Sequence, residues 1–126
     1  MDGTHQLVVV IEDDIGMRQA LQRWLRAAGY RARAYESAEA LLGDDGARDA
    51  DCLVLDVRLP GASGIELYTQ LGHTRPPAVF ITSHDCADVR GAVARLGGTA
   101  VLPKPFLGHQ LMAAITQATA RNQRKD

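Results

Sequence analysis

Carboxylate, hydroxyl and amine side chains come directly after four short apolar segments of this chain. Such segments, four or five residues long and rich in Val, Leu and Ile, are typical of buried parallel strands, both faces of which are covered by helices. In an open parallel sheet, ligands bind beyond the carboxyl ends of the strands. If the four segments belong to one sheet, their polar residues meet at one edge as a site for a divalent cation and a phosphoryl group. These residues are Glu12, Asp13, Asp56, Thr82 and Lys104.

Three consecutive acids, Glu12, Asp13 and Asp14, follow the first apolar segment. They cannot all point the same way, because neighbouring residues of a strand alternate between its faces. Two of them can still approach Asp56 on an adjacent strand. Crowded carboxylates repel one another unless a cation lies among them, and Mg²⁺ is the natural candidate because it binds one or two carboxylates and keeps several waters. The alternative is a cap of the following helix, where the helix dipole favours negative charge.

Asp56 can act as a nucleophile toward phosphorus and form an acyl phosphate. Such a transfer needs a metal ion and a fixed cation to stabilise charge on the equatorial oxygens, together with hydroxyl or amide donors. Thr82 and Lys104 end the two strands expected on the same side of Asp56 and can supply the hydroxyl and the cation. Taken singly, each also fits an ordinary strand-end or surface residue.

The elements that must position these residues alternate along the chain. Strand segments are followed by helical patterns throughout, which predicts βα units around a parallel sheet, and right-handed crossovers leave few strand orders. We therefore predict an α/β domain with a five-stranded parallel sheet, doubly wound as (βα)5. The strands are expected near residues 8–11, 31–35, 52–56, 78–82 and 99–102.

Helical spacing of apolar residues predicts which side chains enter the core. Trp24 lies on such a stripe in the helix that ends at Gly29, so we expect it in the core. The stripe of the last helix is expected to begin at Leu107. Residues 60–64 are rich in turn-forming types and predict a turn-rich connection before the third helix.

Length and composition fit one compact domain over residues 1–126. The chain has 46% hydrophobic residues, and its net charge of -1 provides no basic field for nucleic acid or anionic membrane. No apolar run approaches the roughly 20 residues of a membrane span, and the N-terminus lacks the form of a signal peptide. The two cysteines, Cys52 and Cys86, make no disulfide scaffold. We expect a cytoplasmic domain.

The combined motifs resemble the receiver domain of bacterial two-component response regulators. They are Glu12-Asp13, residues 55–64 around Asp56, Thr82-Ser83 and Lys104-Pro105-Phe106, in that order. The resemblance covers about residues 6–120, and the segment around Asp56 is most similar to the branch with a helix-turn-helix output domain. It implies a flavodoxin-like receiver fold with strand order 2-1-3-4-5 and a phosphorylation-dependent switch that controls an output, in this branch transcription.

The same resemblance implies a metal site. Mg²⁺, with Mn²⁺ as a substitute, would be bound by Asp13, Asp56, Glu12 through water, and the backbone carbonyl of Arg58. Asp14 lies one position beyond the family's acidic pair and is expected to face solvent.

The resemblance also implies roles in switching. Asp56 would accept the phosphoryl group from a sensor histidine kinase or a small phosphodonor, Lys104 would pair with that group, and Thr82 would be the hydroxyl that turns toward it. The Lys104–Pro105 bond is a candidate cis bond, since cis bonds are essentially confined to proline. The helix at 85–95 and the strand at 99–102 would form the face for a partner or for a homodimer.

Two residues depart from the family's pattern. Val101 occupies the position of the usual aromatic switch residue, and Pro103 directly precedes Lys104 and removes one N–H from edge pairing. Arg58 and His84 occupy positions that tune phosphate lifetime in the family, although both also fit exposed loop residues.

Three other classes of function are weaker. An aspartyl-phosphate hydrolase would need an acid–base carboxylate where Arg58 stands, and a flavin module would need a Ser/Thr/Gly-rich loop where Glu12 and Asp13 stand. A degenerate receiver is disfavoured because Asp13, Asp56, Thr82 and Lys104 are all present. The leading prediction is a signalling domain whose own catalysis is limited to self-phosphotransfer and slow autodephosphorylation.

Overall fold

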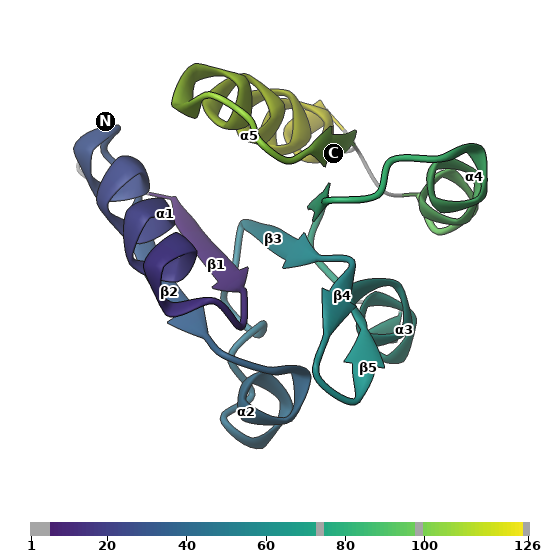
Figure 1. The fold of residues 1–126 in the computed structure, drawn as a ribbon. Coiled ribbons are helices and arrows are strands. Elements are labelled where there is room, and N and C mark those ends of the chain that lie inside the picture. Colours follow the sequence, from purple (N-terminus) through teal and green to yellow (C-terminus); the bar gives the residue numbers. More distant parts are fainter. Residues whose placement is uncertain (1–5, 73–74, 98–99, 125–126) are drawn as a thin grey trace.

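A parallel sheet of five strands forms the centre of the protein (Figure 1). The computed structural model describes residues 6–72, 75–97 and 100–124, with side chains described to residue 120. The strands are β1 (Leu7–Ile11), β2 (Arg31–Tyr35), β3 (Cys52–Asp56), β6 (Ala78–Thr82) and β7 (Ala100–Pro103). Their order across the sheet is β2-β1-β3-β6-β7, which is 2-1-3-4-5 among these five. The predicted fold and strand order are confirmed; residue 99 of the expected last strand lies outside the described residues.

Helices cover both faces of this sheet (Figure 1). The helices α1 (Ile15–Ala27) and α5 (Gly108–Arg124) pack on one face. The helices α2 (Ala38–Gly43), α3 (Gly64–Gln70) and α4 (Ala87–Arg95) pack on the other. None of the helices in these described residues is long and apolar enough to cross a membrane.

Alternation along the strands divides the apolar side chains between two cores. Val8 and Val10 of β1 face α1 and α5, whereas Val9 and Ile11 face α2, α3 and α4. All four are fully buried, and burying an aliphatic side chain of this size contributes roughly 1.5–3 kcal/mol. Both faces of the inner strands must therefore be apolar, and the first polar residues appear where the strands end.

Helix caps fix the points at which the chain leaves the sheet. Asp14 caps α1, because its carboxylate accepts a hydrogen bond from the Met17 amide at 2.8 Å. Its side chain is exposed, as expected, but it also has this capping role. Ser63 and Glu66 form a reciprocal capping box at the start of α3.

Two expected core residues are not in the core. Trp24 is 38% exposed and Leu107 is 61% exposed. In α1 only Leu21 and Leu25 are buried, and the Trp24 ring instead packs edge-on against Phe106, with ring centroids 6.3 Å apart. Leu107 precedes α5 and lies on the connection from β7, so helical spacing does not apply to it.

The connection after β3 forms a small antiparallel hairpin rather than a simple turn. Its strands are β4 (Arg58–Leu59) and β5 (Ala62–Ser63). Pro60 and Gly61 link them, with a φ of 72° at Gly61 that only glycine adopts readily. The hairpin holds the chain between Asp56 and α3 in a defined position.

Candidate functional site

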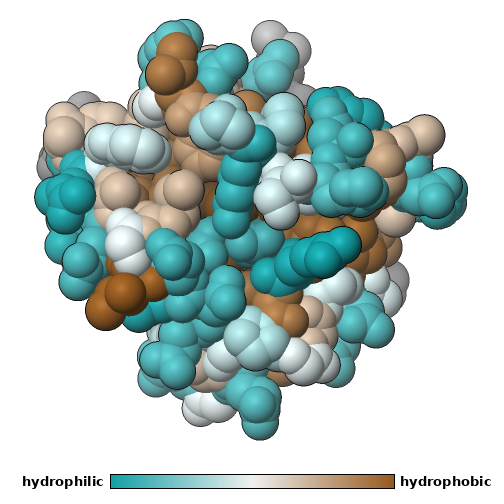
Figure 2. All heavy atoms as spheres, in the orientation of Figure 1, coloured by the Kyte–Doolittle hydropathy of each residue, from teal (hydrophilic) through white to brown (hydrophobic). Residues whose placement is uncertain are grey.

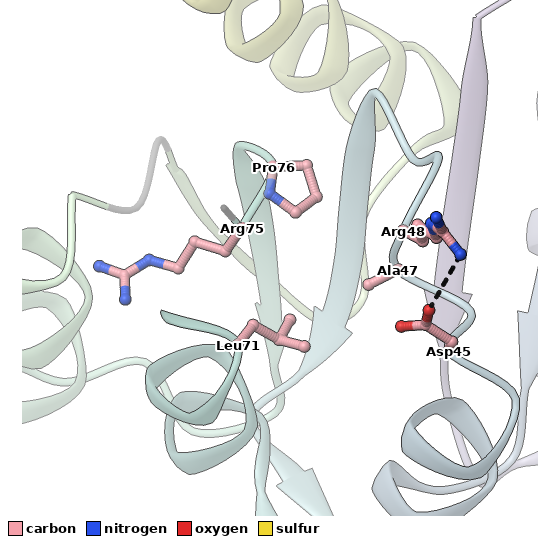
Figure 3. A pocket seen from close by; sticks show the side chains of 6 residues that line it. All are labelled: Asp45, Ala47, Arg48, Leu71, Arg75 and Pro76. Carbon is pink, nitrogen blue, oxygen red and sulfur yellow. Dashed lines mark ion pairs between the residues drawn. The ribbon is translucent and has the colours of Figure 1, made fainter. Parts of the chain in front are cut away.

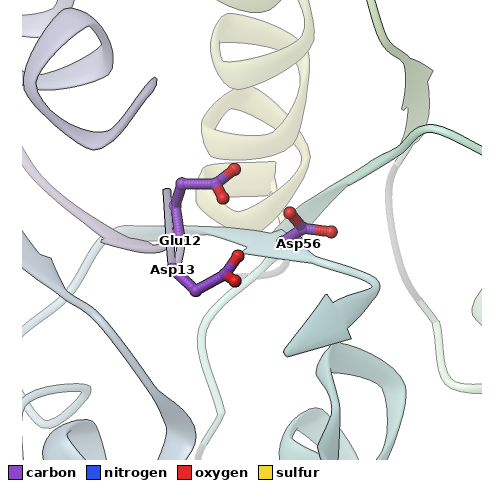
Figure 4. Close-up of side chains that lie close together, drawn as sticks. All are labelled: Glu12, Asp13 and Asp56. Carbon is purple, nitrogen blue, oxygen red and sulfur yellow. The ribbon is translucent and has the colours of Figure 1, made fainter. Parts of the chain in front are cut away.

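Glu12, Asp13 and Asp56 come together where β1 and β3 end (Figure 4). Each offers a carboxylate oxygen, and these three oxygens lie within 4.8 Å of one another. Glu12 and Asp56 are 1% and 5% exposed, whereas Asp13 is exposed to solvent. Two acids of the consecutive triple thus approach Asp56, as predicted. An all-carboxylate donor set with one open side fits a hard divalent cation.

Strand register explains why Lys104 joins this cluster. On each of the three strands, the residue two positions earlier faces α1 and α5. Because side chains alternate along a strand, those of Glu12, Asp56 and Lys104 all point toward this same side of the sheet. The Lys104 Nζ lies 2.8 Å from Asp56 Oδ2 and 3.1 Å from Glu12 Oε1. A single ammonium therefore bridges the two buried carboxylates.

Burial and pairing shift the pKa values of two of these groups. Burial raises the pKa of Glu12 to about 7, although the Asp14 amide and the Lys104 ammonium favour its charged form. Burial lowers the pKa of Lys104, but its hydrogen bonds to Asp56 and Glu12 outweigh this and hold that pKa above its ordinary value. Lys104 is thus a fixed cation near neutral pH.

Backbone contacts hold Asp56 in place. The Arg58 amide donates to Asp56 Oδ1 at 3.0 Å, and the Val57 amide donates to the Ile81 carbonyl at 2.9 Å. Gly64 lies so close that a Cβ there would be 2.3 Å from the Asp56 carbonyl oxygen. Sequence reasoning gave Gly64 no such role, although Ser63 and Glu66 at capping-box spacing mark the start of α3 beside it.

Thr82 ends the neighbouring strand β6. Asp56 pairs with Ile81, so Thr82 is one residue further along, on the side of the sheet that faces α4. It is 2% exposed, and its hydroxyl accepts a hydrogen bond from the His84 amide at 3.0 Å. In this structure the hydroxyl is therefore held by the loop that leads into α4.

The last strand brings Lys104 to the site through the same ladder. Pro103 lies opposite Thr82, and the Lys104 amide donates to the Thr82 carbonyl at 2.7 Å. The Lys104–Pro105 bond is cis, as expected. Pro103 is accommodated because β7 is the edge strand of the sheet.

A surface hollow lies at the other end of the strands from the acidic cluster, before β3 and β6 begin (Figure 3). It has a volume of about 410 Å³ and is lined by Asp45, Ala47, Arg48, Leu71, Arg75 and Pro76. Its charged groups are engaged: Arg48 pairs with Asp45 at 3.9 Å, and Arg75 points away, over the Tyr68 ring and onto the Leu96 carbonyl. This hollow carries no chemistry comparable to that of the acidic cluster.

The surface in the orientation of Figure 1 is mainly hydrophilic at its centre (Figure 2). A few large hydrophobic side chains stand out around it. Among the described residues, the exposed large hydrophobic side chains are Ile15, Trp24, Leu42 and Leu107.

Comparison with known proteins identifies the family. Residues 8–116 match the model of the response regulator receiver domain. The chain belongs to this family. Receiver domains are phosphorylation-dependent switches of two-component systems, so this chain is a signalling domain, and its acidic pocket is of the type in which the family binds Mg²⁺.

Relatives with longer chains include transcriptional regulators. Nodulation protein W of Bradyrhizobium diazoefficiens is 39% identical over 126 residues, which cover 97% of this chain and 55% of that protein. The DNA-binding transcriptional regulator NtrC of Salmonella typhimurium is 29% identical, over 93% of this chain and 25% of that protein. This chain therefore spans about half the length, or less, of these curated relatives.

Solved structures agree on the fold. The response regulator StyR is 35% identical, with a TM-score of 0.84 over 97% of this chain and 63% of that one. A CheY-like receiver domain from Methanospirillum hungatei has a TM-score of 0.89 over 98% of this chain and all of that one, at 17% identity.

Proposed function

We propose that Asp56 is the phosphoacceptor of a phosphorylation-dependent switch. The observation that carries this proposal is a buried aspartate at a strand end, beside two further acids and in contact with a lysine ammonium. An Asp56 carboxylate oxygen attacks phosphorus, the bond from phosphorus to the donor's leaving group breaks, and an acyl phosphate forms.

The acidic cluster must first be made compatible with an anionic donor. Glu12, Asp13 and Asp56, with the backbone carbonyl of Arg58, are the groups that would hold Mg²⁺ or Mn²⁺. The ion would supply positive charge for the phosphoryl oxygens. Without it, the repulsion among the carboxylates and the donor opposes the approach, and Lys104 alone offsets only part of this charge.

Lys104 and Thr82 would respond to the phosphoryl group in different ways. Lys104 already contacts Asp56, so its ammonium can pair with a phosphoryl oxygen after a small movement. Thr82 must exchange its hydrogen bond from the His84 amide for one to the phosphoryl group. That exchange would release the loop between β6 and α4 and shift the start of α4.

The changed surface would then act on a partner. We place a partner or homodimer face on α4 and β7, because α4 follows Thr82, β7 leads directly into Lys104, and β7 is the edge strand of the sheet. The phosphoryl donor would be a sensor histidine kinase, the output would be transcription, and this domain would lie in the cytoplasm. The domain itself would contact neither nucleic acid nor membrane, and its catalysis would be limited to self-phosphotransfer and slow autodephosphorylation.

Intact-mass measurement after incubation with acetyl phosphate tests this proposal. The wild-type chain is expected to gain one phosphoryl group with Mg²⁺ and none in chelator, and Asp56→Asn is expected to gain none. Asp49→Asn, which removes an exposed charge elsewhere, is the matched control and should be labelled like the wild type. Lys104→Ala should lose the downstream response even where Asp56 is still labelled. Labelling of Asp56→Asn, or undiminished labelling in chelator, would refute the assignment.

A further inference from the structure

Arg18 makes an unusual contact with the backbone of the acidic pair. Its side chain is half-buried at the end of the first turn of α1, and its Nη1 reaches back past the start of the helix. This nitrogen donates to the Glu12 carbonyl at 2.9 Å and to the Asp13 carbonyl at 3.3 Å. One guanidinium nitrogen therefore spans two consecutive peptide groups of the loop between β1 and α1.

These two peptide groups flank the Cα of Asp13. The Glu12 carbonyl belongs to the peptide before this Cα, and the Asp13 carbonyl belongs to the peptide after it. Since peptide groups are planar, hydrogen bonds to both carbonyl oxygens restrain the two backbone dihedrals of Asp13, and with them the direction of its Cβ. Arg18 thus restrains the direction in which the Asp13 side chain leaves the backbone.

One other described contact acts on these two peptides: the Asp14 amide, which belongs to the peptide after the Asp13 Cα, donates to Glu12 Oε2 at 3.0 Å. Glu12 accepts hydrogen bonds from Lys104 and from the Asp14 amide, and Asp56 accepts from Lys104 and from the Arg58 amide. The exposed Asp13 carboxylate accepts no hydrogen bond and forms no ion pair within the part of the chain that the structure describes. Its backbone is the only part of it that is held.

The position of Arg18 is otherwise unfavourable. A cation near a helix N-terminus opposes the helix dipole, and α1 has no acidic residue in its first turn to offset it. The two hydrogen bonds to the Glu12 and Asp13 carbonyls stabilise the guanidinium at this position.

We propose that Arg18 is a positioning residue for the divalent-cation site, acting through Asp13. This inference rests on the proposed function, because it assumes that Asp13 is a ligand. Mg²⁺ requires near-ideal octahedral geometry, so a ligand that is already oriented binds it more tightly than one that must be ordered. Residues that orient metal ligands typically contribute 10–100-fold to affinity.

The sign of the effect separates positioning from charge. Arg18 carries a positive charge close to the cation site, so removing it should tighten Mg²⁺ binding if only Coulomb repulsion matters. If Arg18 orients Asp13, removing it should weaken binding despite the lost repulsion. The two explanations predict opposite changes.

The experiment is a Mg²⁺ titration of the full chain, in which backbone amide chemical shifts report the binding. Arg18→Met is expected to raise the Kd about tenfold. Arg23→Met is the matched control, because Arg23 is exposed on the same helix and the charge change is identical; its Kd should stay within about twofold of wild type. Arg18→Lys keeps a donor and the charge and should recover part of the affinity. An Arg18→Met affinity equal to or tighter than wild type would overturn the proposal.

A double variant tests the route through Asp13. In the Asp13→Asn background, Arg18→Met should change the Kd by less than about twofold, because there is no longer a carboxylate to orient. If the losses of Mg²⁺ affinity caused by Asp13→Asn and Arg18→Met simply add in the double variant, the positioning role is contradicted. If Arg18→Met fails to fold, the Arg18→Lys and Arg18→Gln titrations decide between the same outcomes. Absence of Mg²⁺ binding in the wild type, or binding unaffected by Asp13→Asn, would instead contradict the proposed function.

Discussion

Phe80 lies directly opposite Val101 in the register between β6 and β7. The Phe80 ring is fully buried and packs edge-on against Tyr68, with ring centroids 5.5 Å apart. Val101 is only partly buried and packs against the same core. Both aromatic rings are therefore held inside the core between the sheet and α3, and position 101 beside them has a short aliphatic side chain.

Val101→Ala should leave phosphorylation-dependent association nearly unchanged. A valine is short and stiff at χ1, so it makes few contacts that differ between two states of the switch, and only such differences shift the equilibrium. The lost packing should cost about 1 kcal/mol of stability. Association measured with and without beryllium fluoride, a mimic of the phosphoryl group, checks this; a response lost in Val101→Ala would make Val101 a switch residue.

Thr82→Ala should separate labelling from response. The variant keeps every charge of the site, so Mg²⁺ affinity and phosphorylation of Asp56 should remain close to wild type. It loses the hydroxyl that accepts from the His84 amide, which should cost about 1 kcal/mol and abolish the change in association. Ser83→Ala removes an exposed hydroxyl from the next position and is the control. If Thr82→Ala still shows the full change in association on phosphorylation, the hydroxyl has no part in the switch.

Gly64→Ala should destabilise the domain and disturb Asp56. A Cβ at Gly64 would meet the Asp56 carbonyl oxygen at 2.3 Å, so α3 or the end of β3 must move. We expect a loss of roughly 1–3 kcal/mol in urea unfolding and slower phosphorylation of Asp56. Gly43→Ala, whose Cβ would meet nothing within 4 Å, should be neutral or slightly stabilising. Equal stability of the two variants would contradict this account of the Asp56–Gly64 contact.

The metal-free protein should lose stability as pH rises from about 4.5 to 7. Burial raises the pKa of Glu12 to about 7 in the folded state, above its ordinary value of 4.5. The folded state therefore binds this proton more tightly, so the contribution is fully present below pH 4.5 and is lost as pH approaches 7. We expect a decline on the order of 2 kcal/mol relative to Glu12→Gln, measured by urea unfolding in chelator. Parallel pH profiles for the two proteins would show that Glu12 titrates normally.

Elements with a clear pattern of apolar residues could be predicted from the sequence. The apolar segments that form β1, β3 and β6 lie where they were expected, and the acids at their ends meet for the reason that a parallel sheet implies. The hairpin of β4 and β5 was missed because two-residue strands have no period to detect. Trp24 was placed wrongly because helical spacing does not tell how far the sheet extends beneath a helix.

The individual contacts within the site could not be predicted from the sequence. The bridge from Lys104 to Glu12 depends on the shared alternation of β1 and β7, which requires the register. The contact of Arg18 with two carbonyls depends on the path of the loop between β1 and α1, which no spacing rule gives. The close approach of Gly64 to Asp56 requires the position of α3.

Chemical mapping of the acyl phosphate would show which residue accepts the phosphoryl group. Borohydride reduces an aspartyl phosphate to homoserine, which marks the modified residue permanently in a peptide map. After treatment with acetyl phosphate and Mg²⁺, we expect homoserine at position 56 alone, with Asp13 and Asp14 unchanged in the same digest. Homoserine at either of those positions, or a phosphorylated chain with an unmodified Asp56, would contradict it.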